Sequence, residues 1–228
     1  MTRAGLSAVA ALALAGAAAG PASSAPVVDQ MVVFRSGKAV TQAARTDATR
    51  VRAGRRRCRV PRATPLAALV RSQVAALRVR DYSGACDPST LFVTAIDRER
   101  NRGQRGWVYK VGNRLGSTAA SDPSGPFGSG RLKRRVRITW FYSERTGQRT
   151  LGLRLRDEGD GRVTARVSAY DDDGRGTPAK GATVRNGATS ATTDARGVAT
   201  LELSPGTHRL HAEQRGAIRS FDERVRVG

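Results

Sequence analysis

The strongest constraint on the fold is a series of short segments in which apolar and polar residues alternate with a period of two. Residues 162–169 read RVTARVSA, the pattern of a strand with one buried face. Similar alternation recurs over 199–203, 207–213 and 224–227, and turn-forming Asp, Gly and Pro residues separate the segments. Short strands divided by turns typically pack as two facing sheets, so the sequence predicts an all-β sandwich here.

Three motifs in the same part of the chain carry a family resemblance. GATV occupies 181–184, TDARGVA occupies 193–199 and PGTH occupies 205–208. In this order they resemble the bacterial immunoglobulin-like and carboxypeptidase-regulatory-like sandwiches, in which a GATV strand precedes TD-x-x-G and PGTY motifs. His208 stands where that family has Tyr. The resemblance implies an immunoglobulin-like β-sandwich domain over 149–228 that serves as a spacer or adhesive module.

The preceding part of the chain combines one helix with strands. Thr64 suits a helix N-cap because its hydroxyl can accept from the first turn, and Pro65 is favoured at the first helical position. An apolar stripe at helical spacing follows, made of Leu66, Leu69, Val70, Val74 and Leu77. Strands are predicted at 91–96, 107–111 and 136–142. We therefore expect an α+β module in which one helix packs on a mostly antiparallel sheet.

A second resemblance covers this module. TPLAAL at 64–69, LFVTAI at 91–96, GWVYKVGN at 106–113 and RITWFY at 137–142 follow one another in an order similar to a bacterial domain of unknown function. That domain is related to the C-terminal β domain of transcobalamin and intrinsic factor, which implies a transcobalamin-C-terminal-like α+β domain over 26–148.

This chain departs from the second family at two turns. It has Gly112-Asn113 where the family has Asn-Gly, and Lys133–Arg135 where the family has a Gly-Asp turn. In the animal proteins the domain lies over bound cobalamin, but a helical domain that supplies much of that site has no counterpart here. The resemblance therefore makes a cobamide-type small ligand an alternative function, and no cofactor is predicted.

The first 25 residues have the features of a secretory signal peptide. Arg3 provides a positive start, 6–19 is an apolar run, and small residues crowd 22–25. The alternative is a membrane anchor, but a span needs about 20 apolar residues and this run is shorter. We expect cleavage near Ala25 and a secreted, extracellular protein.

The two cysteines fit an oxidising compartment. Cys58 and Cys86 are the only cysteines, and a bridge between them closes a loop of 28 residues. Two cysteines alone cannot complete a structural zinc site, and no CxxC motif is present. We expect a disulfide, with two free thiols as the alternative.

Positive charge is concentrated in the first module. Residues 31–150 hold 26 basic and 7 acidic residues, a net charge of +19, whereas 151–228 hold 13 and 11, a net charge of +2. This asymmetry favours two modules with any polyanion-binding surface on the first. Arginine outnumbers lysine 36 to 4, which indicates a GC-rich genome, so part of the charge reflects codon composition.

The densest basic runs are the candidate polyanion-binding residues, with a merely solvated face as the alternative reading. These residues are Arg55, Arg56, Arg57, Arg59, Lys133, Arg134, Arg135 and Arg137. Four aromatic residues are candidates for contact with a sugar, base or tetrapyrrole: Trp107, Tyr109, Trp140 and Tyr142. Their regular alternation favours a place in the core of a sheet.

Several catalytic and metal-binding chemistries are disfavoured. His208 and His211 are three apart in a predicted strand, so they point to opposite faces and cannot chelate one metal together. No G-x-S-x-G motif is present. The three adjacent aspartates, Asp171–Asp173, indicate a solvated turn rather than a calcium site, because the positively charged Arg175 lies just after them. The glycine-rich stretch 125–130 lacks the lysine of a phosphate-binding loop.

These observations predict an exported, non-catalytic interaction protein of the bacterial cell surface or medium, with no metal site. The basic module would contact a cell-envelope polyanion or a surface protein, and nucleic acid only non-specifically. The sandwich would act as a spacer. The alternative is a small-ligand binding protein of the cobamide type.

Overall fold

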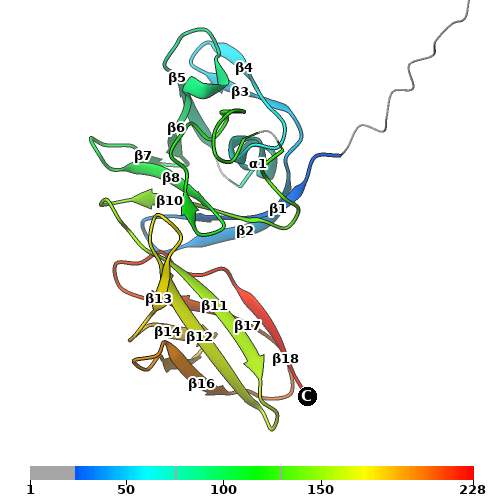
Figure 1. Cartoon of the computed structure of the whole chain (residues 1–228), viewed down its shortest axis with the longest axis vertical. Coiled ribbons are helices and arrows are strands. Elements are labelled where there is room, and N and C mark those ends of the chain that lie inside the picture. The colour runs from blue at the N-terminus through cyan, green and yellow to red at the C-terminus, as the bar shows by residue number, and fades with distance from the viewer. Residues whose placement is uncertain (1–23, 75, 129) are drawn as a thin grey trace, which may run out of the picture.

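The computed structural model describes residues 24–228 apart from positions 75 and 129. In this part the protein is mostly β, with four sheets and a single α-helix (Figure 1). No helix among the described residues is long and apolar enough to cross a bilayer. Residues 1–23 of the predicted signal peptide, which spans 1–25, lie outside the described residues.

Two five-stranded sheets build the N-terminal part. The first has the order β2-β1-β10-β8-β9, in which β1 and β10 pair in parallel although about a hundred residues separate them. Its strands are β1 (Val27–Val33), β2 (Ala39–Arg45), β8 (Gly106–Val111), β9 (Arg114–Leu115) and β10 (Arg137–Ser143). The second has the order β4-β3-β5-β6-β7. Its strands are β3 (Thr49–Ala53), β4 (Arg56–Val60), β5 (Leu77–Asp81), β6 (Leu91–Ile96) and β7 (Glu99–Arg100).

The sequence pattern predicted one helix on a single, mostly antiparallel sheet. The chain instead forms two sheets, and four strands precede the helix. The predicted strands at 91–96, 107–111 and 136–142 are confirmed as β6, β8 and β10.

The helix α1 (Pro65–Ser72) begins where the sequence predicts. The Thr64 hydroxyl accepts a hydrogen bond from the Ala67 amide at 3.3 Å, and Pro65 occupies the first turn. The prediction of an apolar helical stripe that continues to Leu77 is wrong. Gln73 adopts a left-handed conformation with φ of 51°, which ends the helix, and Leu77 begins β5.

Two four-stranded sheets build the C-terminal part, and they are β-sandwich-like. One contains β11 (Thr150–Asp157), β12 (Arg162–Tyr170), β13 (Gly176–Pro178) and β16 (Val198–Glu202), and the other contains β14 (Thr183–Asn186), β15 (Thr189–Thr192), β17 (Gly206–Glu213) and β18 (Glu223–Val227). Buried side chains of both sheets form one apolar cluster, as their alternation requires. The alternating segments predicted from the sequence correspond to β12, β16, β17 and β18.

The two parts of the chain have separate apolar cores and meet at a third, smaller cluster. The N-terminal core includes α1 and the inward faces of both its sheets. At the junction, Met31, Val33 and Phe141 of the β1–β10 sheet pack with Ile218 and Phe221, which come from the loop between β17 and β18. Figure 1 shows this loop next to the lower edge of the N-terminal part.

A disulfide joins Cys58 on β4 to Cys86, just before the short 3-10 helix η1 (Pro88–Thr90), as predicted. It ties the edge strand of the second sheet to the loop that follows β5. Cys58 is fully buried and belongs to the N-terminal core.

Candidate polyanion-binding surface

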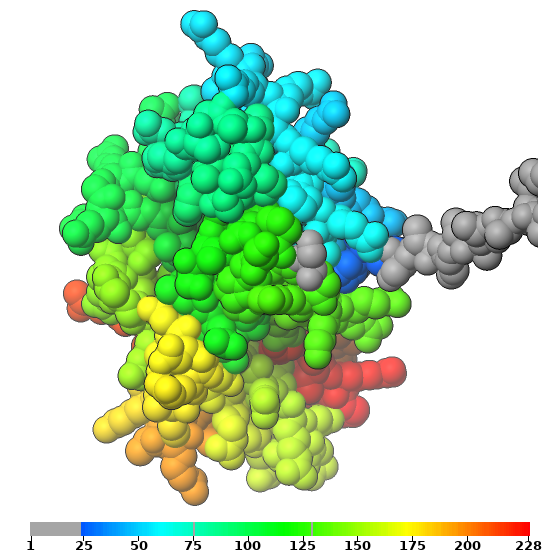
Figure 2. Space-filling model, turned by 45° about the horizontal axis from the view of Figure 1, so that its top comes forward, coloured from blue at the N-terminus to red at the C-terminus, as the bar shows by residue number. Residues whose placement is uncertain are grey.

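The outer face of the β4-β3-β5 sheet carries a row of arginines. Because side chains alternate along a strand, the inward placement of Val51, Cys58 and Val79 sends their neighbours outward. We call the resulting exposed set the arginine face: Arg50 and Arg52 on β3, Arg57 and Arg59 on β4, and Arg78 and Arg80 on β5. Figure 2 shows that the cyan segment, which includes β3 and β4, projects at the end of the molecule remote from the C-terminal part.

The register of the sheet sets these like charges against each other. Arg50 lies directly opposite Arg59, and Arg52 lies directly opposite Arg57. Directly opposed like charges destabilise a sheet. Within the described residues, no member of the arginine face forms an ion pair with an acid. Arg80 stacks on the Tyr82 ring at 4.6 Å and Arg52 donates to the Gly54 carbonyl, but neither contact neutralises its charge. The face therefore carries positive charge that no acid of the described residues compensates.

A groove of about 840 Å³ opens beside the arginine face, and the β3–β4 turn and β5 both line it. Arg52, Arg78 and Arg80 line it together with Arg55 and Arg56 of the turn. Five guanidinium groups around one groove create a strongly positive potential, which attracts and orients anions. Guanidinium is also the group that binds phosphate and carboxylate oxygens in a bidentate manner.

Two acids, Asp81 and Asp97, also line this groove, and Asp81 is already engaged. The Asp81 carboxylate accepts hydrogen bonds from the amides of Cys86 and Ser83. The Cys86 amide is the main cause that lowers the pKa of Asp81. The carboxylate therefore serves the turn that carries the disulfide.

The second basic run predicted from the sequence lies on the other sheet of the N-terminal part. Lys133, Arg134 and Arg135 are exposed in the segment that precedes β10. Arg137, the first residue of β10, donates to the Glu223 carboxylate of β18 through its two terminal guanidinium nitrogens, Nη1 and Nη2, the second at 3.1 Å. This contact to Glu223 is the leading cause that raises the pKa of Arg137. The structure thus gives Arg137 a partner across the junction, which leaves it less available to an external anion.

The four candidate aromatic residues lie together in the N-terminal core. Trp107 meets Tyr142 edge to face at 5.9 Å between ring centroids, and Tyr109 lies 5.1 Å from Trp140. All four are less than 8% exposed. Their placement agrees with the alternation that favoured a core position.

Three of these rings also line a pocket of about 490 Å³. Trp107, Tyr109 and Trp140 form part of its wall, and the exposed rings of Tyr82 and Phe92 stand at its opening. The indole Nε1 of Trp140 is buried without a hydrogen-bond partner. Such orphaned donors are rare in native structures.

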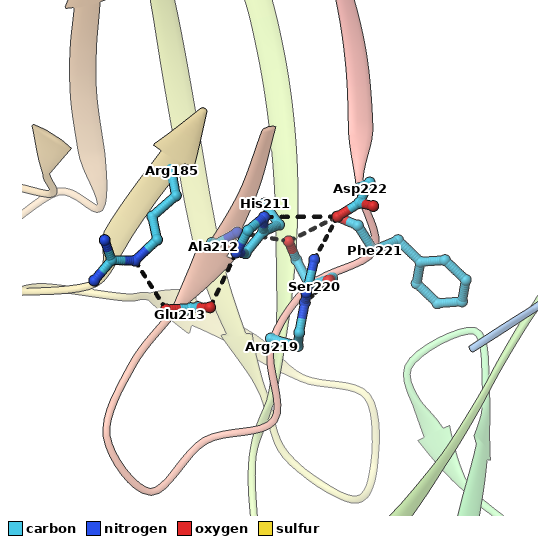
Figure 3. A network of polar contacts seen from close by, with 8 residues as sticks. All are labelled: Arg185, His211, Ala212, Glu213, Arg219, Ser220, Phe221 and Asp222. Carbon is cyan, nitrogen blue, oxygen red and sulfur yellow. Dashed lines mark hydrogen bonds and ion pairs between the residues drawn. The ribbon is translucent and has the colours of Figure 1, made fainter. Parts of the chain in front are cut away.

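The two histidines lie on opposite faces of β17, as the sequence predicts. His208 contacts the Asn186 side chain at 3.0 Å and the Ser204 carbonyl at 2.7 Å. His211 lies between two carboxylates, 3.0 Å from Glu213 and 3.6 Å from Asp222 (Figure 3).

The network in Figure 3 contains one hydroxyl, that of Ser220, and its hydrogen bonds go to the backbone. The Ser220 hydroxyl accepts from the Ala212 amide and donates to the Phe221 carbonyl (Figure 3). Among the described residues no hydroxyl bonds to either histidine ring. The network therefore links β14, β17 and the loop before β18, and it presents no paired nucleophile and base.

The Asp171–Asp173 segment forms a turn, but its three carboxylates have distinct partners. Asp171 accepts from the amides of Asp173 and Arg175, and the side chains of Asp173 and Arg175 pair at 2.8 Å. Asp172 pairs with the buried Lys110 of the N-terminal part at 3.1 Å. The predicted turn is present, and Asp172 has in addition a partner at the junction that the sequence did not predict.

The chain matches no protein-family model, no curated protein and no solved structure at a significant level.

Sequence reasoning missed four members of the arginine face: Arg50, Arg52, Arg78 and Arg80. The sequence does contain a pattern that marks these arginines, because arginine alternates with an apolar residue in RVRA at 50–53 and in RVRD at 78–81. A search for uninterrupted basic runs passes over this pattern. A period-two search for arginine would have found it.

Proposed function

We propose that this protein is an exported, non-catalytic interaction protein that binds an acidic polymer through the arginine face. The N-terminal part, residues 26–148, is the binding module, of α+β type, and 149–228 form an immunoglobulin-like sandwich that spaces it. The observation that carries this proposal is the two directly opposed arginine pairs, Arg50 with Arg59 and Arg52 with Arg57, on a face that forms no ion pair within the described residues.

An opposed arginine pair alone is not distinctive, because Arg209 and Arg224 also stand opposite each other on β17 and β18. The arginine face differs in extent. It continues over three neighbouring strands and borders a groove to which the β3–β4 turn adds two further arginines. A polymer of repeating anionic groups matches such an extended charge, and its binding would relieve the repulsion between the guanidinium groups.

The test compares two variants that each remove one opposed arginine pair. The first is Arg52→Gln with Arg57→Gln on the arginine face, and the control is Arg209→Gln with Arg224→Gln on the C-terminal sheets. Affinity for fluorescent poly(glycerol phosphate) is measured between about 50 and 200 mM salt. Each lost phosphate contact lowers the slope of log affinity against log salt by about 0.9 or less.

We expect the first variant to lower this slope by about 1 to 2 and the control to leave it unchanged within error. Equal effects of both variants would mean that total charge alone drives binding. A third variant, Arg134→Gln with Arg135→Gln, tests whether the exposed segment before β10 also contributes. Single-stranded DNA as a second polymer distinguishes a general polyanion site from one adapted to the glycerol phosphate backbone.

A second candidate function, small-ligand binding, is favoured by the aromatic pocket. Its volume is within the range of about 300–1,000 Å³ found for ligand sites, and five aromatic rings surround it. This space suits one planar group, so a cobamide-type ligand would place a single ring there.

Glycine 116 offers a selective way to test the pocket. A Cβ atom at Gly116 would stand 2.0 Å from the Tyr109 ring, so Gly116→Val must displace that ring from its place in the pocket wall. Cyanocobalamin should quench the tryptophan fluorescence of the unmodified protein, because Trp107 and Trp140 line the pocket. Quenching of equal strength in Gly116→Val would contradict ligand entry here.

Export is the third element of the proposal. The disulfide and the lack of a spanning helix among the described residues are compatible with an extracellular protein. N-terminal sequencing of protein from the culture medium should begin within a few residues of Ala25. An intact Met1 on the exported product would contradict a cleaved signal peptide.

A further inference from the structure

A second, smaller cleft of about 340 Å³ lies where the two parts of the chain meet. Its walls come from both parts. Arg137 and Thr139 of β10 face it from the N-terminal side, and residues of β11 and β12 face it from the C-terminal side. The polyanion proposal does not use this cleft.

Three alternate residue pairs of the β11–β12 ladder form its C-terminal wall. Thr150 pairs with Tyr170, Gly152 with Ser168, and Arg154 with Arg166. These pairs are two residues apart along each strand, so their side chains share one face of the sheet. The missing side chain at Gly152 is required here, because a Cβ atom would lie 2.7 Å from the Tyr170 ring.

The charge of the cleft is positive. Arg154 and Arg166 stand directly opposite each other, are exposed, and form no ion pair within the described residues. Arg137 lies across from them, held by Glu223 and stacked over the Phe221 ring at 5.0 Å. Among the described residues that line the cleft, three are arginines and none is acidic.

Hydroxyl groups complete the lining. Thr139, Thr150, Ser168 and Tyr170 all contribute to the wall. Thr150 is only 6% exposed, and its hydroxyl is buried without any hydrogen-bond partner in the protein. Buried hydroxyls normally have a partner, so this group points to a bonding capacity that the fold itself leaves unused.

We propose that this cleft binds a small phosphate ester of a polyol. The Arg154 and Arg166 guanidinium groups would hold the phosphate, since two adjacent guanidiniums supply the donors that phosphate oxygens accept. The hydroxyl-bearing wall would bind the polyol. Bound anion would also remove the repulsion between the two opposed arginines.

The test uses the purified protein and three probes: glycerol 3-phosphate, inorganic phosphate and glycerol. Binding is measured by calorimetry and located by the amide signals of Gly152 and Thr150 in ¹H–¹⁵N spectra. We expect 1:1 binding of glycerol 3-phosphate, weaker binding of inorganic phosphate and no binding of glycerol. Inorganic phosphate that binds as tightly as the ester would overturn the role of the hydroxyl wall.

Matched variants separate the cleft from general charge. Arg154→Gln with Arg166→Gln should weaken glycerol 3-phosphate binding by at least about tenfold, because each lost charged contact is worth that much. Arg209→Gln with Arg224→Gln removes another opposed pair and should leave affinity unchanged. Equal losses in both variants, or shifts confined to other residues, would overturn the proposal.

A variant that keeps the charge gives an independent check. Thr150→Val preserves the shape of the residue and removes only its hydroxyl, so it should weaken the ester and leave inorganic phosphate binding unchanged. If Thr150→Val leaves the ester affinity unchanged as well, the buried hydroxyl takes no part. Unfolding curves of each variant establish that the fold is retained.

Discussion

The ammonium of Lys110 lies 3.1 Å from the carboxylate of Asp172, and this ion pair joins the two parts of the chain. The Lys110 side chain is fully buried on β8. It also donates to the backbone carbonyl of Asp171 at 2.8 Å. A charge removed from water is tolerated only when it is paired and hydrogen-bonded. Among the described residues, the partners of Lys110 come from the end of β12 and the turn that follows it: the carbonyls of Tyr170 and Asp171 and the carboxylate of Asp172.

Truncation of Lys110 should therefore destabilise the protein more than its replacement by a long apolar side chain. Lys110→Ala leaves a cavity and two carbonyls without their donor, and we expect a loss of about 3 kcal/mol in the free energy of unfolding. Lys110→Met keeps most of the volume and should cost about 1 to 2 kcal/mol. Urea unfolding measures both values. Equal losses would show that packing contributes nothing at this position.

The pH dependence of stability should report the same lysine. Burial is the main cause that lowers the pKa of Lys110, and Asp172 only partly offsets it. Below pH 10.5 the unfolded chain then binds this proton more readily than the folded chain, so stability rises with pH in the interval just below 10.5. The difference in unfolding free energy between the unmodified protein and Lys110→Met should increase there. A difference that shrinks toward pH 10.5 would contradict the assigned direction.

The contact between Lys110 and Asp172 illustrates what the sequence could not predict. Local signals predicted the start of α1, because the Thr64 cap and Pro65 act within a single turn. Alternation likewise predicted β12 and β16–β18. The parallel pairing of β1 with β10 and the pairing of Lys110 with Asp172 depend on residues far apart in the chain, and no local pattern specifies them.

The candidate sites likewise combine features that the sequence shows with features that only the fold determines. The basic runs at 55–59 and 133–137 are visible in the sequence, but the ladder decides which arginines share a face. Arg137 carries the same charge as Arg57, yet only Arg137 meets an acid, Glu223, from another part of the chain. The junction cleft depends on the β11–β12 register and on a side chain absent at Gly152, so only the three-dimensional structure identifies it.

Tyr109 should make the protein sensitive to alkaline pH. Burial raises the pKa of its phenol to about 12, while its hydroxyl donates to the Thr118 carbonyl at 3.1 Å. Because the folded pKa lies above the unfolded value of 10.0, this contribution is fully present below pH 10 and is lost as pH rises toward about 12. Tyr109→Phe should cost about 1 kcal/mol at pH 8.

The check is a comparison of unfolding free energies for the unmodified protein and Tyr109→Phe between pH 8 and about 11. We expect a constant difference up to pH 10 and a decreasing difference above it, because only the tyrosine can ionise. Ultraviolet titration gives a second measurement, since the phenolate of Tyr109 should appear last. A phenol of Tyr109 that ionises with the ordinary pKa of 10 would contradict its burial.

The Cys58–Cys86 disulfide should contribute much of the stability of the N-terminal part. It closes a loop of 28 residues that contains α1 and β5, and restriction of such a loop in the unfolded chain corresponds to about 3.5 kcal/mol. Cys58→Ala with Cys86→Ala should therefore lower the unfolding temperature by about 10 °C. Reduction of the unmodified protein should have a similar effect. Mass spectrometry of unreduced peptides should show the pair directly, and free alkylation of both thiols would contradict it.

Loss of the bridge should also weaken polymer binding. Cys58 packs in the core from the inner side of β4, while its neighbours Arg57 and Arg59 lie on the outer side and belong to the arginine face. If polymer binding is unchanged in the folded, reduced protein, the arginine face does not need the bridge to keep its register.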